Sequence, residues 1–116
     1  DQIAALANIV AAAGVPVRVH AFLDGRDAPP RSARGYLAAF AQSLKPGLPI
    51  RIGTVDGRFY AMDRDKRWDR VTKAYEALVD AKGARAATPD EAVAQGYAAD
   101  LTDEFVLPTV IGDYAG

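Results

Sequence analysis

Helix-like and strand-like segments alternate along this chain, and that alternation constrains its fold more than any other feature. Apolar residues recur at helical spacing in four stretches, which begin near residues 3, 31, 68 and 88. Between and after them lie strand-like runs, at residues 16–23, 50–55 and 104–111. The sequence therefore predicts the α/β fold class: a layered α/β domain with a mixed sheet flanked by helices.

Local signals refine this pattern. Thr88 and Glu91, with Pro89 at the first helical position, form a capping box that opens the last predicted helix. Gly53 marks a close approach to the second strand, and Pro108 indicates a sheet edge or a strand end. The apolar stripes of the first three helices consist of Ile3, Leu6, Val10 and Ala13; of Tyr36, Leu37, Phe40 and Leu44; and of Trp68, Val71, Tyr75 and Leu78.

Composition excludes several classes of protein. The 116 residues include no cysteine, which rules out disulfides and thiolate metal sites. A formal net charge of -1 gives no basic excess, so we expect no nucleic-acid partner. No apolar run approaches the roughly 20 residues of a membrane span, and no signal peptide is visible, so we expect a cytoplasmic protein without a membrane partner. The chain lacks an initiator Met and both ends look cut, which indicates a piece of a larger protein.

Two polar turns follow the first two predicted strands. One is HAFLDGRDAPP, residues 20–30, and the other is DGRFYAMDRDKRWDR, residues 56–70. Each precedes a predicted helix, and ligands of open α/β sheets bind where strands end and loops open into helices. Arginine offers a planar fork of donors that fits two oxygens of a phosphate or carboxylate. The turns therefore predict one shared site for a small anionic substrate.

The first turn contains His20, Arg26 and Asp27 as candidates. His20 is the only histidine, and a single strand histidine is equally compatible with a packed, hydrogen-bonded core residue. Gly25 permits an unusual backbone angle that could turn Arg26 and Asp27 toward one point. The alternative is a surface turn in which Asp24 caps its own backbone.

The second turn contains Arg58 and Arg64, on either side of an aromatic pair. Two arginines around one phosphate would form bidentate, charge-assisted hydrogen bonds. The alternative is a solvated charged face, which we accept for Lys66, Arg67 and Asp69. We reject it for Arg58, which precedes the predicted helix, and Arg64 is an intermediate case.

Other chemistries lack support in the sequence. The aspartates at 63, 65 and 69 resemble a calcium loop, but Trp68 stands where that loop needs glycine and Ala74 where it needs glutamate. One histidine without cysteine makes a closed zinc site improbable. No Gly-rich phosphate loop and no nucleophile elbow is present.

Three blocks together, HAFLDGRDAPP, GRFYAMDRDKRWDR and DEFVLPTVI, resemble the cofactor-independent (2,3-bisphosphoglycerate-independent) phosphoglycerate mutases. The blocks occur in the family's order, and the resemblance spans nearly the whole chain. It implies an isomerase of glycolysis that interconverts 3-phosphoglycerate and 2-phosphoglycerate. Such an enzyme is a monomer with a phosphatase-like domain and an inserted substrate-binding domain, and the chain, residues 1–116, would be a fragment of the inserted domain.

The resemblance also implies roles for individual residues. His20, Arg26, Asp27, Arg58 and Arg64 would contact substrate, and Asp27 would be the catalytic candidate for proton transfer at the substrate hydroxyl. The serine that becomes phosphoserine and the two manganese ions would belong to the phosphatase-like domain, so we expect no metal and no catalysis in this chain alone. The residues leave two other functions open: a non-catalytic anion- or phosphopeptide-binding module, and an interaction domain whose arginines only decorate a helix.

Overall fold

The computed structural model describes residues 2–25, 31–45, 47–62 and 67–116. Within these ranges the helices are α1 (Gln2–Ala12), α2 (Ala33–Ser43), α3 (Arg58–Ala61), α4 (Trp68–Asp80) and α5 (Pro89–Ala98), with the 3₁₀ helix η1 (Asp103–Phe105). The strands are β1 (Val17–Leu23), β2 (Ile50–Gly57), β3 (Ala84–Ala86) and β4 (Thr109–Ile111). None of these helices is both long enough and apolar enough to cross a membrane.

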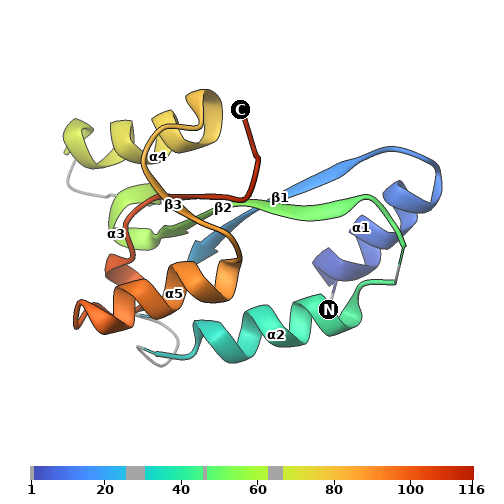
Figure 1. The fold of residues 1–116 in the computed structure, drawn as a ribbon, viewed down its shortest axis with the longest axis horizontal. Helices are drawn as coiled ribbons and strands as arrows, with labels where there is room; N and C mark the ends of the chain where they lie inside the picture. Colours follow the sequence, from blue (N-terminus) through green and yellow to red (C-terminus); the bar gives the residue numbers. More distant parts are fainter. Residues whose placement is uncertain (1, 26–30, 46, 63–66) are drawn as a thin grey trace.

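The described strands form one mixed sheet in the order β1-β2-β4-β3. β1 pairs with β2 in parallel, β3 pairs with β4 in parallel, and β2 meets β4 antiparallel. Helices cover both faces, with α1, α2 and α5 on one side and α4 on the other (Figure 1). This arrangement confirms the predicted α/β class with a mixed sheet flanked by helices.

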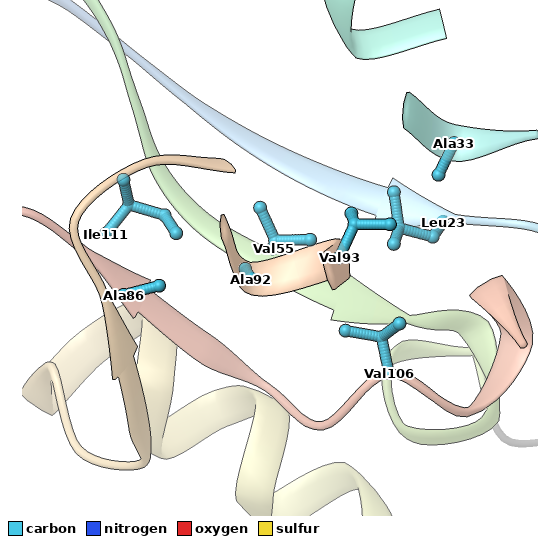
Figure 2. Packing of buried hydrophobic residues seen from close by; sticks show 8 residues of the cluster. All are labelled: Leu23, Ala33, Val55, Ala86, Ala92, Val93, Val106 and Ile111. Atoms are coloured by element: carbon cyan, nitrogen blue, oxygen red, sulfur yellow. The ribbon is translucent and has the colours of Figure 1, made fainter. Parts of the chain in front are cut away.

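The main core lies between the sheet and helices α2 and α5. Val55 of β2 and Val93 of α5 are fully buried there, and Figure 2 shows them with their neighbours from all four strands. The core side chains are Leu23, Ala33, Val55, Ala86, Ala92, Val93, Val106 and Ile111. A smaller cluster of Ala77, Ala81 and Val110 packs α4 onto the opposite face.

Alternation along β2 sends different chemistry to the two faces of the sheet. Val55 enters the main core, whereas Thr54 and Asp56 share the other face because side chains alternate along a strand. The register with β1 shifts beside Gly53, where an added Cβ would lie 2.9 Å from the Tyr114 ring. The close approach predicted at Gly53 is confirmed, and its partner is an aromatic ring.

The predicted start of α5 is also confirmed. The Thr88 hydroxyl accepts a hydrogen bond from the Glu91 amide at 3.2 Å, and Pro89 occupies the first turn. The Glu91 carboxylate accepts from the Ala87 amide, one residue before the cap. The cap therefore satisfies one donor that a helix start leaves without an intrahelical partner, and Glu91 also holds the residue before the cap.

The predicted apolar stripes were partly wrong. In α1 the buried residues are Ala4, Ala7 and Ala11, while Ile3 and Leu6 are more than 60% exposed. In α4 alanines are again buried, and Trp68 and Tyr75 are exposed; Tyr36 of α2 is exposed as well. Small side chains let a helix approach the sheet closely, so the alanine face, rather than the bulkier one, turns inward.

Two segments differ from the predicted elements. The run at 104–111 is not one strand, because it begins as η1 and pairs only from Thr109 to Ile111, directly after Pro108. Arg58 precedes the predicted helix, which is α4, but it also starts the four-residue helix α3, which was not predicted. The three-residue strand β3 carries too little pattern to have been predicted.

The η1 segment packs directly on the end of β2. The Gly57 amide donates to the Val106 carbonyl at 2.9 Å. A Cβ added at Gly57 would lie 2.3 Å from the Glu104 carbonyl oxygen and 2.7 Å from the Val106 nitrogen. Both neighbours are backbone atoms, which cannot rotate away, so only glycine fits.

We therefore predict that Gly57→Ala destabilises the protein by about 3 kcal/mol, the upper end of the usual overpacking cost. Gly35→Ala in α2 is the matched control, because a Cβ there meets nothing within 4 Å. In a helix that control should be neutral or stabilising. Urea denaturation measures both changes, and equal midpoints for the two variants would contradict the packing account.

Candidate functional site

The residues that open the two polar turns, as far as the structure describes them, lie at one edge of the sheet. β1 and β2 remain paired up to their last residues, where Leu23 faces Gly57. Asp24 and Arg58 follow directly, so the parallel register places them side by side. The expectation that both turns share an edge agrees with this geometry.

Arg58 and Asp24 form an ion pair across that edge. Arg58 Nη1 donates to Asp24 Oδ1 at 2.7 Å. The Arg58 side chain is only 12% exposed and that of Asp24 is 39% exposed. Because the Arg58 side chain is largely buried, this short pair restricts its guanidinium, and a restricted guanidinium can present its donors to an anion in a limited range of orientations.

Two further cationic side chains, both from α4, lie over the aromatic rings of α3. The Arg70 guanidinium lies 4.0 Å from the centre of the Phe59 ring, and Lys73 Nζ lies 5.7 Å from that of Tyr60. Phe105 of η1 packs on Phe59 with ring centres 5.0 Å apart. Cations over aromatic faces are held by the ring quadrupole, so these contacts order both α3 and its basic neighbours.

His20 lies within β1 rather than at the edge. Its Nδ1 is 2.9 Å from the Thr54 hydroxyl, and its ring meets Tyr114 edge-on with centres 5.3 Å apart. Partial burial lowers the pKa of His20, which keeps the ring neutral at pH 7. Three strand residues separate it from the edge, about 10 Å at the usual rise.

Asp56 is a fully buried carboxylate at the end of β2. Among the residues that the structure describes, neither of its oxygens has a hydrogen-bond partner. Burial raises the pKa of Asp56 to about 7, because a charged carboxylate is disfavoured away from water.

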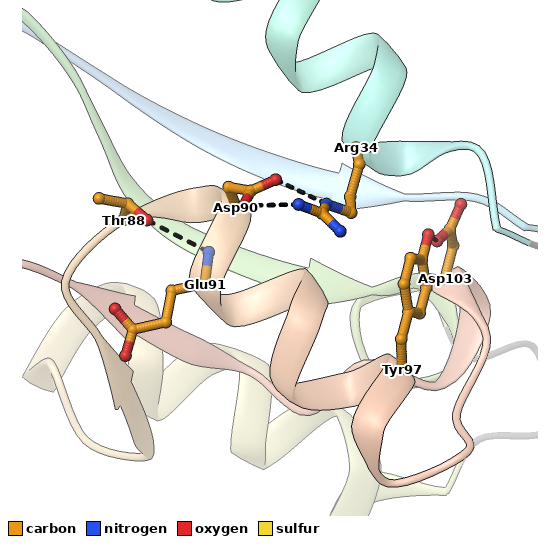
Figure 3. Close-up of polar contacts among 6 residues, drawn as sticks. All are labelled: Arg34, Thr88, Asp90, Glu91, Tyr97 and Asp103. Carbon is orange, nitrogen blue, oxygen red and sulfur yellow. Dashed lines mark hydrogen bonds and ion pairs between the residues drawn. The ribbon is translucent and has the colours of Figure 1, made fainter.

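Asp103 is the second buried carboxylate, and it is fully engaged. Its Oδ2 accepts from the backbone amides of Ser32, at 2.9 Å, and Ala33, at 2.8 Å. The Tyr97 hydroxyl donates to its other oxygen, and Figure 3 shows the two side chains in contact. Burial and the Asp103 carboxylate raise the pKa of Tyr97 to about 12, so the phenol keeps its proton. Asp103 therefore serves as the side-chain cap that Ser32 does not provide for α2.

A cavity of about 300 Å³ lies between β1, α1 and α2 and extends to the start of the first turn, where Asp24 and Gly25 line it. Its described walls are mostly apolar, with Val19, Ala21, Leu37 and Phe40 among them, and include no Lys or Arg. An anionic ligand needs positive groups, so this cavity does not suit one. The charged groups at the edge, rather than this cavity, define the candidate site.

The structure brings together only part of the predicted site. It places Arg58 at the shared edge and His20 inside the sheet, while Arg26, Asp27 and Arg64 lie outside the described residues. Over the described ranges no group of three or more His, Asp or Glu side chains is placed to hold a metal ion.

Sequence reasoning missed Asp56 and Asp103. Thr54 and Asp56 stand two residues apart, which in a strand indicates one face, and this was the available signal for Asp56. No sequence signal pointed to Asp103, since an acidic residue before an apolar run resembles an ordinary loop residue.

Comparison with known proteins gives a consistent result. A family model described as "BPG-independent PGAM N-terminus (iPGM_N)" matches residues 1–116. The 2,3-bisphosphoglycerate-independent phosphoglycerate mutases of Gluconobacter oxydans and Dinoroseobacter shibae are 53% and 54% identical over all 116 residues. The chain spans only 22% and 23% of the length of these two curated relatives.

A solved structure shares the fold. Leishmania mexicana phosphoglycerate mutase, crystallised at low cobalt concentration, matches with a TM-score of 0.81 and 29% sequence identity. The match covers 95% of this chain and 22% of that one.

The Asp56 carboxylate predicts a specific pH dependence of stability. Its pKa is about 7 in the folded state and 3.8 as a free side chain. The folded state of this group therefore binds more protons between these values, so the contribution of Asp56 to stability is highest below pH 4 and is lost as pH rises through 7. The loss amounts to about 4 kcal/mol once the group is ionised.

We predict that Asp56→Asn, which carries no charge at any pH, gains stability over the wild type as pH rises from 4 to 8. Asp69→Asn, at a 72% exposed side chain, is the control and should stay parallel to the wild type. Denaturant unfolding at several pH values measures the difference. Parallel profiles for Asp56→Asn and the wild type would contradict a raised pKa.

Proposed function

The chain belongs to the 2,3-bisphosphoglycerate-independent phosphoglycerate mutase family over all its 116 residues, and on that premise we propose that it is the substrate-binding part of such an enzyme. The parent protein interconverts 3-phosphoglycerate and 2-phosphoglycerate in glycolysis, as an isomerase that moves the phosphoryl group within one molecule. It is a cytoplasmic monomer of two domains, and residues 1–116 belong to the inserted substrate-binding domain. The names of the relatives support the mutase activity, their lengths support a longer parent protein, and the other proposals follow from the family resemblance.

The ion pair between Arg58 and Asp24 is the observation that carries this function. Phosphoglycerate bears a phosphate and a carboxylate, each with oxygens spaced for a guanidinium. Asp24 orients Arg58 through one nitrogen, and the planar guanidinium then has all five of its N–H directions set. A preset donor array binds an anion without first losing rotamer freedom.

The remaining substrate contacts are proposed from the family's motifs. Arg26 and Arg64 would bind the anionic groups of the substrate, and Asp27 would accept and return the proton of its hydroxyl. His20 supports the site indirectly in this proposal, because its neutral ring bonds Thr54 within the sheet. Arg26, Asp27, Arg58 and Arg64 belong to the two polar segments that the sequence singled out, whereas His20 belongs to β1.

The chemistry of phosphoryl transfer is proposed to lie in the parent's other domain. A serine there becomes phosphoserine, and manganese is the expected metal. The described residues of this chain do not fit a metal ion, since no cluster of three ligands is present among them. The role left to this chain is to hold and orient the glycerate while the phosphoryl group moves.

We predict that Arg58→Ala in the full-length enzyme lowers kcat/KM at least about 100-fold, because two charge-assisted hydrogen bonds are lost. Arg58→Lys should also be strongly impaired, since an ammonium cannot replace the planar guanidinium. Steady-state assays with 3-phosphoglycerate measure both.

Arg34→Ala is the matched control. Arg34 pairs with Asp90 on the surface and is half exposed, so its loss should leave kcat/KM within about twofold. Near-normal activity of Arg58→Ala would contradict the proposal that this edge of the sheet binds substrate.

We also predict that the 116-residue chain alone shows no mutase activity. The proposed nucleophile and metal lie elsewhere in the parent, and binding without them accelerates nothing. An assay that couples 2-phosphoglycerate formation to enolase, with full-length enzyme as the positive control, tests this. Turnover by the isolated chain would contradict the division of roles.

A further inference from the structure

One short element touches both turns of the candidate site. Gly25, at φ +67°, lies against η1 so closely that an added Cβ would be 2.7 Å from the Glu104 nitrogen and 2.9 Å from Asp103 Cβ. Gly57 lies against the same segment, with its amide bonded to the Val106 carbonyl. The residues just before Arg58 and just after Asp24 therefore rest on one three-residue helix.

Asp103 adds a side-chain attachment to these backbone contacts. Its carboxylate is 1% exposed and accepts from the amides of Ser32 and Ala33. Gly25, in the first turn, thus rests on the backbone of η1, and Ser32, two residues beyond that turn, is held by the Asp103 side chain. Tyr97 of α5 holds the other carboxylate oxygen, which connects the attachment to the main core.

We infer that η1 is the positioning element of the substrate site, and that Asp103 is its principal positioning residue. This inference rests on the proposed function. Asp103 acts through the turns and does not touch substrate itself.

The physical reason is that η1 couples groups that must bind one small molecule together. Phe105 packs on Phe59 beside Arg58, and Asp103 holds the start of α2 beyond the first turn. A carboxylate that accepts from two amides and a phenol has a single favourable position. Loss of that position lets the two turns shift relative to each other, and misplacement by about 1 Å is enough to lower substrate affinity strongly.

The test uses three variants of the full-length enzyme, each assayed for KM and kcat with 3-phosphoglycerate at a temperature where circular dichroism shows the variant folded. Asp103→Ala removes the acceptor and should raise KM about 10-fold. Asp103→Asn keeps an oxygen that can cap the two amides, so it should restore KM to within about threefold. Asp90→Asn breaks the surface pair between Asp90 of α5 and Arg34 of α2, and it should leave KM unchanged.

KM separates positioning from stability. A smaller folded fraction lowers apparent kcat but leaves KM as it was, whereas a displaced binding turn raises KM. An Asp103→Ala enzyme that is folded and has a wild-type KM overturns the inference. So does an Asp103→Asn enzyme as impaired as Asp103→Ala.

If Asp103→Ala does not fold, Tyr97→Phe replaces it in the test. This variant removes only the hydroxyl that donates to Asp103 Oδ1. It should raise KM about 3-fold, and an unchanged KM overturns the inference. The wild-type assay distinguishes the two levels of the argument. Absence of interconversion in the wild type overturns the proposed function and this inference with it, while an active wild type with an unaltered variant KM overturns the inference alone.

Discussion

The parallel pairing of β1 with β2 is the constraint on which the rest of the site depends. Because the register holds to the last residue of each strand, the chain leaves the sheet twice at the same place. Arg58 and Asp24 then come within hydrogen-bond distance, although 34 residues separate them in sequence. A slip of one residue in this register would turn the strand side chains to opposite faces and move the ion pair out of alignment.

The edge is closely packed because backbone, not side chains, fills it. Gly25 and Gly57 bring two main-chain segments against η1 at distances that no other residue allows. Such contacts leave amides without water, and each needs an acceptor within the protein. The Val106 carbonyl serves Gly57, and the Asp103 carboxylate serves the first amides of α2. The polar groups at this edge therefore hold the turns, while the small apolar core beneath supports the sheet.

Sequence patterns predicted what depends on local chemistry and failed where tertiary packing decides. The course of β1, the capping box at Thr88 and the close approach at Gly53 follow from residue type and spacing, and all three are present. The inward faces of α1 and α4 do not follow from residue type and spacing, because the close approach of a helix to a sheet favours alanine over larger apolar side chains. Asp56 and Asp103 escaped prediction for a related reason: their burial is set by segments distant in sequence.

Electrostatics at the edge are consistent with an anionic ligand. A site for phosphate must limit negative charge from its own carboxylates, and two of them stand within two residues of the strand ends. The charge of Asp24 is compensated by Arg58 at 2.7 Å. That of Asp56 is suppressed by burial, since a pKa of about 7 leaves about half of these groups protonated at neutral pH. With one carboxylate paired and the other partly protonated, the cations over Phe59 and Tyr60 add positive charge near this edge.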